Sequence, residues 1–279
     1  MRFPNILSVF LLLSSLSACV TGVESPSVHW LETESGFLVE YRDRAGLLVK
    51  RIEMNRDSIT HGCYEIYTID GQPKLQAYFS DGILYGSWYA TVAGCQSGGE
   101  LMQQEKEGIW EYHASVNGNC TLSASLSFRN GVMYGGQFRF DSINGNWIYS
   151  FHDGTGEKGR AVLKGESNFD LRGLFYFFDL GRSPAADEEI ELMLYVADIP
   201  GLTPVISVLD QSEDEGVLLI EIKPFRYENR MFVWSVDSLR EAGTADAGLV
   251  DLKLLDKYEY DVHRDLVYLL PFSAGAIED

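Results

Sequence analysis

Apolar and polar positions alternate along most of this chain, a pattern typical of β-strands with one buried face. Aromatic and β-branched residues recur in short runs from about residue 29 to about residue 160, and Asp-Gly or Asn-Gly pairs separate several of these runs. Such pairs permit positive φ at both centres of a type I′ turn, so the runs are predicted to form β-hairpins. One hairpin cannot bury its own apolar face. The pattern therefore predicts an all-β protein in which antiparallel hairpins stack into a long curved sheet.

Five segments repeat a leading glycine, an aromatic residue within two positions and a later turn glycine. The first four leading glycines are 26, 24 and 22 residues apart, and a fifth segment follows after a longer interval. The leading glycines are Gly36, Gly62, Gly86, Gly108 and Gly145. Residues 79–86 are also echoed by residues 128–135. This spacing predicts that each repeat is one hairpin of similar size.

The repeats resemble those of the MORN family, in its bacterial form. The matching pieces are Tyr85-Gly86-Ser87-Trp88, Gly108-Ile109-Trp110 and Gly145-Asn146-Trp147, whereas Gly62-Cys63-Tyr64 and Gly36-Phe37 lack the tryptophan. The resemblance covers at most half of the chain. It implies a binding or scaffold surface and brings no catalytic residues with it. A plain antiparallel meander with aromatic strands and glycine turns would show the same pattern.

Three tryptophans, Trp88, Trp110 and Trp147, occupy the same place in three of the repeats. If their strands are in register, the three rings form a row on one face of the sheet. An aromatic row can bind sugars, peptides or lipid tails, so these residues are the predicted binding surface. Large aromatic side chains also dominate buried cores, and a packed core is the favoured alternative for the same three residues.

The pattern changes after about residue 180. Residues 181–187 have the composition of a linker. The acidic segment that follows contains short apolar runs at residues 190–196, 217–222, 231–236, 249–255, 258–262 and 266–272, and residues 238–242 suit one helical turn. These runs predict a smaller acidic β-sandwich-like region. We therefore divide the chain into a repeat domain, 29–180, and an acidic β-rich domain, 181–279; one continuous β body is the alternative.

The first residues have the layout of an export signal. The apolar run at 6–13 is shorter than the roughly 20 apolar residues that a helix needs to span a bilayer. It leads into Leu16-Ser17-Ala18-Cys19, which resembles the lipobox of bacterial lipoproteins. The resemblance implies a signal peptide at 1–18, acyl chains on Cys19 that anchor the protein in a membrane, and a tether at 19–28. Val20 in place of Asp implies the outer membrane, with the body facing the periplasm.

Composition restricts the partners of this chain. The formal net charge is −19, with 41 acidic and 22 basic residues, and such a surface repels nucleic-acid phosphates and anionic lipid headgroups. Hydrophobic residues make up 46% of the chain and aromatic residues 13%, enough for a folded core. The composition therefore favours a folded protein that does not bind nucleic acid.

The cysteines suit a compartment that permits disulfides. With Cys19 committed to lipid, Cys63, Cys95 and Cys120 remain, so one pair and one leftover thiol are possible. Cys95 and Cys120 lie at similar points of two successive repeats, and we prefer this pairing over three buried free thiols. No Cys-x-x-Cys pattern is present, so the spacing does not suggest a zinc site.

No catalytic or metal-ligating constellation stands out in the sequence. The five histidines do not have the spacing of metal ligands. His113 and His152 follow the aromatic residues of two repeats and are a weak candidate for a metal or proton site. The favoured interpretation is that both are ordinary residues on the polar face of a strand. The acidic runs 187–189 and 210–216 fit solvated loops better than calcium loops, because runs of charge usually keep a surface soluble. In the second run the glycine is also at the wrong position for an EF-hand loop. We expect no cofactor.

The sequence thus favours a lipid-anchored, non-enzymatic module that binds a protein or an envelope polymer. Two other functions remain open. An envelope glycan hydrolase would use an Asp/Glu pair at a separation that only the fold can supply. A carrier of an apolar ligand would need a β-cavity.

Overall fold

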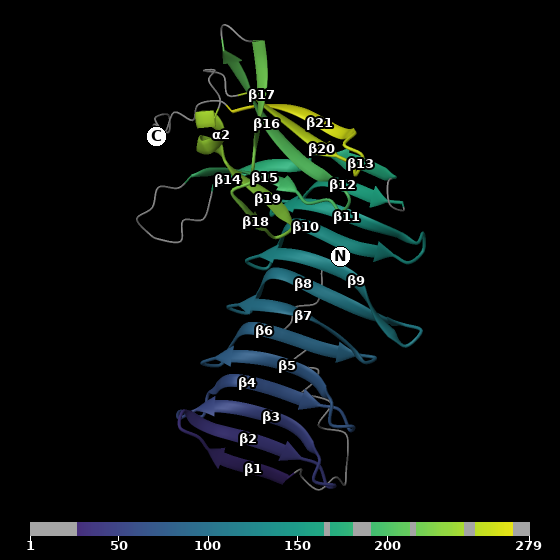
Figure 1. Ribbon diagram of the computed structural model, residues 1–279. Helices are drawn as coiled ribbons and strands as arrows, with labels where there is room; N and C mark the ends of the chain where they lie inside the picture. Colours follow the sequence, from purple (N-terminus) through teal and green to yellow (C-terminus); the bar gives the residue numbers. More distant parts are fainter. Residues whose placement is uncertain (1–26, 165–167, 181–190, 213–215, 243–248, 270–279) are drawn as a thin grey trace. The chain divides into compact units, whose positions relative to one another are not determined.

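A computed structural model describes residues 27–164, 168–180, 191–212, 216–242 and 249–269. The predicted signal peptide at 1–18, the lipidation site Cys19, most of the tether and the 181–187 linker lie outside the described residues. Thirteen antiparallel strands follow one another in chain order in the largest sheet, and two four-stranded sheets follow (Figure 1). The predicted all-β class, with successive antiparallel strands and then a smaller β region, is confirmed. The chain divides into two compact units, 1–82 and 83–279, which are described separately.

The first unit contributes five strands to the largest sheet. They are β1 (Ser27–Glu32), β2 (Gly36–Arg42), β3 (Leu48–Asn55), β4 (Thr60–Tyr67) and β5 (Pro73–Ser80). Val39, Ile52 and Ala77 are buried on one face of these strands. Val39 is the ladder partner of Ile52, so the two side chains share this face. The alternation seen in the sequence thus produces one apolar face.

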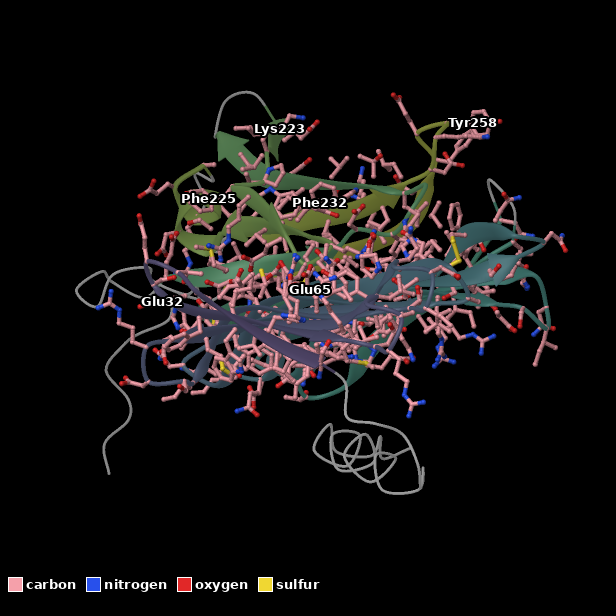
Figure 2. All side chains as sticks on the ribbon, turned by 90° about the horizontal axis from the view of Figure 1, so that it is seen from below. Glu32, Glu65, Lys223, Phe225, Phe232 and Tyr258 are labelled. Atoms are coloured by element: carbon pink, nitrogen blue, oxygen red, sulfur yellow. A yellow bond between two sulfur atoms is a disulfide. The ribbon has the colours of Figure 1, made fainter. Side chains whose placement is uncertain are left out.

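The opposite face of the first unit carries a ladder of charged side chains. Glu40 pairs with Arg51 across β2 and β3, and Arg51 pairs with Glu65 across β3 and β4. Arg51 lies 3.1 Å from the Glu40 carboxylate and 3.6 Å from that of Glu65, and Arg42 lies 2.7 Å from Glu40. Glu65 also accepts hydrogen bonds from Tyr67 and Gln76, and it is labelled among the side chains in Figure 2. Each carboxylate is therefore matched by donors on its own or neighbouring strands.

This ladder predicts a local acid sensitivity. Hydrogen bonds from Arg42 and Arg51 lower the pKa of Glu40 below its ordinary value of 4.5. The ionised carboxylate therefore stabilises the strands above pH 4.5, and this contribution is lost as the pH falls through the lower, folded-state pKa. Hydrogen exchange of β2 and β3 amides should be faster in Glu40→Gln than in the wild type at pH 6, and the difference should shrink below pH 4. An unchanged difference across this range would contradict the prediction.

The second unit contains the remaining strands of the largest sheet. They are β6 (Ile83–Val92), β7 (Cys95–Met102), β8 (Glu105–Val116), β9 (Asn119–Arg129), β10 (Val132–Asp141), β11 (Asn146–Asp153), β12 (Glu157–Leu163) and β13 (Phe169–Gly173). One four-stranded sheet has the order β14 (Tyr176–Leu180), β15 (Leu192–Ala197), β19 (Met231–Ser235), β18 (Arg226–Glu228). The other has the order β17 (Gly216–Ile222), β16 (Thr203–Ser212), β20 (Leu249–Leu255), β21 (Asp261–Tyr268). The helix α2 (Val236–Ala242) follows β19.

The turns explain why successive strands pair so regularly. Asp81-Gly82, Asn117-Gly118 and Asn130-Gly131 have positive φ at both residues, as type I′ turns require. Asp70-Gly71 and Asp153-Gly154 differ from the prediction, because only their glycines have positive φ. Asp153 instead accepts hydrogen bonds from the Thr155 and Gly156 backbone N–H groups, which gives a longer turn.

The main core of the second unit joins the largest sheet to the two smaller ones. Tyr149, Phe151 and Ala161 on β11 and β12 are fully buried, and they belong to one cluster with residues of β15, β16, β19 and β20. Phe138, Tyr149 and Ala161 are successive ladder partners and so share the covered face. In Figure 1 the smaller sheets lie beside β10–β13. The core therefore contains residues from both sides of the predicted boundary at residue 180, and the division into separate domains stays a prediction.

The C-terminal strands match the predicted runs in part. The structure has strands at four of the predicted runs, as β15, β17, β19 and β20, and α2 includes the predicted helical turn. The prediction of a strand at 258–262 was largely wrong, because Asp256 accepts hydrogen bonds from the backbone N–H groups of Tyr258 and Tyr260 and so forms a turn. The strand β21 (Asp261–Tyr268) begins after this turn and includes the start of the predicted run at 266–272, whose residues 270–272 lie outside the described residues.

The tight turn between β18 and β19 contacts an irregular part of β10. Asn229 and Arg230 both have positive φ, and the Asn229 carbonyl accepts a hydrogen bond from the Gly136 N–H at 3.0 Å. The β9–β10 register shifts between Met133 and Gln137, the stretch that contains Gly135 and Gly136. A Cβ atom on Gly135 would lie 2.3 Å from the Asn229 carbonyl oxygen. Glycine is therefore required where the turn meets the sheet.

A partly buried arginine adds a second link between the sheets. The Arg129 guanidinium lies 3.4 Å from the centre of the Tyr134 ring and forms ion pairs with Asp179 of β14 at 2.9 Å and Glu228 of β18 at 3.2 Å. Tyr134 donates a hydrogen bond to the same Asp179 carboxylate at 2.7 Å. The arginine thus connects the C-terminal end of β9 to β14 and β18, two strands of the β14-β15-β19-β18 sheet.

Replacing Gly135 should test the contact between the turn and the sheet. Gly135→Ala and Gly145→Ala both place a side chain at positive φ, at a cost of about 1–2 kcal/mol each. Only Gly135 has a close neighbour, whereas the Cβ position of Gly145 is open within 4 Å. Gly135→Ala should therefore lower the free energy of unfolding by a further ~1–3 kcal/mol, measured by urea denaturation. Equal losses in the two variants would contradict the contact.

Candidate functional site

The repeats occupy alternate strands until the fifth copy. Gly36, Gly62, Gly86 and Gly108 lie on β2, β4, β6 and β8, so each of the first repeats spans two strands. The copy that begins at Gly145 leads into β11, three strands after β8. An odd number of strands reverses the strand direction relative to the earlier copies.

The three tryptophans consequently do not line one face. Trp88 and Trp110 share a face and stack with ring centres 5.6 Å apart. Trp110 pairs with Leu126, Leu126 pairs with Gln137, and Gln137 pairs with Ser150, so these four side chains share that face. Trp147 lies three residues before Ser150 on β11 and therefore points to the opposite face. There its ring stacks on Phe138 at 4.2 Å.

Trp110 is the centre of a second hydrophobic core. Its side chain is 3% exposed and packs with Leu101 and Phe128, and the partly buried Trp88 covers the cluster. The Trp110 Nε1 donates a hydrogen bond to the Glu100 carbonyl at 2.9 Å, and the Lys106 ammonium lies 4.4 Å from the Trp110 ring. Trp110 therefore fills the core, the alternative that the sequence favoured.

The structure brings Cys95 and Cys120, the preferred pair, together in a disulfide, with Cα atoms 5.4 Å apart. Cys95 begins β7 and Cys120 lies at the start of β9, so the bond holds the tip of the β8–β9 hairpin against β7. Cys63 is an exposed free thiol. Partial desolvation and the neighbouring Glu53 and Glu65 carboxylates raise the pKa of this thiol.

The two histidines considered for a metal or proton site are far apart. His113 lies on β8 and His152 on β11, three strand spacings away, which corresponds to about 14 Å. No group of three or more His, Cys, Asp or Glu side chains within the described ranges could hold a metal ion. The acidic runs 187–189 and 210–216 both lie outside the residues whose side chains are described.

The face opposite Trp110 carries a hollow of about 420 Å³ on β6, β7 and β8. Its lining residues, Tyr89, Gln96, Gly98, Gly99, Glu100, Ile109, Glu111 and His113, all come from these three strands. Tyr89 and Glu111 are both ladder partners of Gly98, so the three residues form a row across the hollow. Its volume is in the range of about 300–1,000 Å³ that small-molecule sites occupy.

Two consecutive glycines create the floor of this hollow. A Cβ atom on Gly98 would lie 2.7 Å from the Tyr89 ring, and one on Gly99 would lie 2.6 Å from the Trp110 ring. The two glycines thus admit an aromatic ring on each face of the same strand. Next to them, β8 carries extra residues, because the β7–β8 register shifts between Gly98 and Glu100. The buried tryptophan core therefore directly supports the floor of the hollow.

The hollow is acidic. Glu100 accepts a hydrogen bond from the Ser87 hydroxyl at 2.7 Å, whereas the exposed Glu111 carboxylate has no hydrogen bond or ion pair within the described part of the chain. None of the lining residues is Lys or Arg. The Arg230 guanidinium donates a hydrogen bond to Ser125, the ladder partner of Glu111 on β9, rather than to Glu111 itself. The site thus presents two carboxylates without a paired cation.

His113 carries an unsatisfied polar group at one end of the hollow. Its backbone N–H donates to the Ser97 hydroxyl at 2.8 Å, but its buried Nδ1 atom has no hydrogen-bond partner among the described residues. Leaving a buried polar atom unsatisfied costs about 1–3 kcal/mol.

The sequence analysis missed this hollow, because no motif marks it. Tyr89 and Glu111 directly follow the repeat tryptophans Trp88 and Trp110, and His113 follows Tyr112, but their side chains lie on the face opposite the rings of Trp88 and Trp110. The pair Gly98-Gly99 within a strand was the available signal, since glycine inside a strand often marks close approach of a ring, a backbone or a ligand.

No family model, curated protein or solved structure matches this chain. In the part of the chain that the structure describes, no helix is both long and apolar enough to cross a membrane.

Removing the disulfide should loosen one end of the hollow. The bond closes a loop with a sequence separation of 25 residues, so Cys120→Ser should lower the free energy of unfolding by about 3–4 kcal/mol. Hydrogen exchange of the β8–β9 hairpin tip should rise most, and Cys63→Ser is the control without a disulfide partner. Equal exchange at the tip in the wild type and Cys120→Ser would show that the bond does not hold this hairpin.

Proposed function

We propose that the chain is a lipid-anchored protein of a bacterial envelope, facing the periplasm, that binds a protein or an envelope polymer without catalysing a reaction. The lipobox-like run ending in Cys19 supports the anchor. The observation that carries the binding role is the hollow on β6–β8, a concave site with a glycine floor, a tyrosine and carboxylates that lack a paired cation.

The position of the hollow also suits binding. Its floor is supported by the Trp110 core, and the Cys95–Cys120 disulfide holds the hairpin at one end. A rigid, preformed surface loses little conformational entropy when it binds a partner. Two carboxylates in the lining do not suit an apolar ligand, so a carrier function is less favoured than a polar-ligand site.

Glycan hydrolysis is the second candidate. Glu100 and Glu111 line one hollow beside an aromatic ring, and glycosidases use two carboxylates that flank the scissile bond. This activity predicts release of reducing sugars from isolated envelope material by the wild type and none by Glu100→Gln. Absence of release by the wild type would exclude the second candidate.

The binding role and the anchor can be tested together with the full-length chain. The wild type should fractionate with membranes, and Cys19→Ser should shift most of the protein to the soluble fraction. Affinity capture from detergent-solubilised envelopes should recover a defined partner with the wild type, and Glu111→Lys should reduce the recovery at least severalfold. Glu32→Lys, an equal charge change on the exposed strand β1, is the control. Recovery of the same set of proteins by the wild type, Glu111→Lys and Glu32→Lys would contradict binding at the hollow.

A further inference from the structure

Beyond its concave shape, the hollow has an acidic lining, with the Arg230 guanidinium held at Ser125 on the neighbouring strand β9. On β8, Glu105, Glu107, Ile109 and Glu111 alternate onto the face of the hollow, and Glu100 is the ladder partner of Glu107. Lys106, the basic residue within this stretch of β8, points to the opposite face, where it contacts Trp110. Strand alternation therefore places the acidic residues on the face of the hollow and the lysine on the face of the core.

The apolar part of the lining lies beside these carboxylates. The Tyr89 ring lies over Gly98 and is partly buried, and Ile109 is 38% exposed on the neighbouring strand. A flexible methylene chain packs well against such side chains, while a charged group at its end remains near polar atoms. An aromatic face also attracts a cation within about 6 Å of its centre.

We propose that the hollow binds a lysine-type side chain of a peptide, with the protonated amine between Glu100 and Glu111 and the alkyl chain against Tyr89 and Ile109. The inference rests on the proposed binding function and names its ligand class. Charge complementarity carries it, because two neighbouring carboxylates repel each other and an ammonium group removes that repulsion. A neutral sugar would leave the repulsion unchanged.

Peptide binding to the detergent-solubilised full-length protein provides the test. The probe is an acetylated and amidated peptide, Gly-Lys-Gly-Lys-Gly, and its control has both lysine amines acetylated, which removes their charge without removing the alkyl chain. Isothermal titration at 50 mM salt should show binding of the first peptide and at least tenfold weaker binding of the second. Affinity should fall as the salt concentration rises.

Protein variants locate the site. The double variant Glu100→Gln/Glu111→Gln should bind the lysine peptide about tenfold more weakly, the low end expected for charge-assisted hydrogen bonds in a partly exposed site. Tyr89→Phe should retain binding, and Tyr89→Ala should lose about threefold in affinity. Glu32→Gln is the matched charge control, and the unfolding midpoint of each variant verifies that it is folded.

The outcomes separate the inference from the function on which it rests. Equal binding of the lysine peptide by the wild type and the double variant, or equal binding of the acetylated peptide, overturns the ligand assignment. Binding of a neutral oligosaccharide that Tyr89→Ala weakens, without binding of the lysine peptide, overturns the assignment but leaves a binding hollow. If Glu111→Lys loses the envelope partner but the wild type does not bind the lysine peptide, lysine is rejected as the ligand and the proposed binding function is retained.

Discussion

Strand alternation is the constraint on which this structure depends. Each side chain in a strand points to one face of the sheet, and its ladder partner on the next strand points to the same face. In the first unit this rule separates an apolar face with Val39 from a charged face with Glu40. In the second unit it places Trp110 and Glu111, which are adjacent in the chain, on opposite faces with different roles.

The same rule accounts for the presence of two cores on opposite faces of one unit. The Trp110 cluster lies on one face of β6–β9, and the Tyr149 cluster lies on the other face of β10–β13, where the smaller sheets cover it. The hollow lies on the same face as the Tyr149 cluster. The smaller sheets cover this face at β10–β13, whereas the hollow is at β6–β8. An open acidic site is thus the uncovered continuation of a buried surface.

Much of the fold was predictable, because the governing signals are local. The period-two alternation and the pair Asn130-Gly131 predicted hairpins, and the structure has them. The face of Trp147 was not predictable, since it depends on counting every strand between Gly108 and Gly145 and on β-bulges that leave no clear mark in the sequence. The strand β16 was not among the predicted runs; its Pro204 lies near the start of the strand, where proline is tolerated. The hollow depends on how three strands align, which no single segment encodes.

The chain order of the strands has a consequence for how such a sheet can change in length. Deleting or inserting one hairpin preserves the direction of every later strand, so buried positions remain buried. Deleting or inserting a single strand reverses the direction of every later strand, and the faces are then kept only if the turn that closes the gap has the right number of residues. The repeat at Trp147 combines two changes: its strand runs opposite to those of the earlier copies, and its aromatic ring lies on the other face, where β14–β21 provide a cover. Sheets of this type are therefore expected to vary between relatives in steps of two strands, and a step of one marks the place where a new layer packs on.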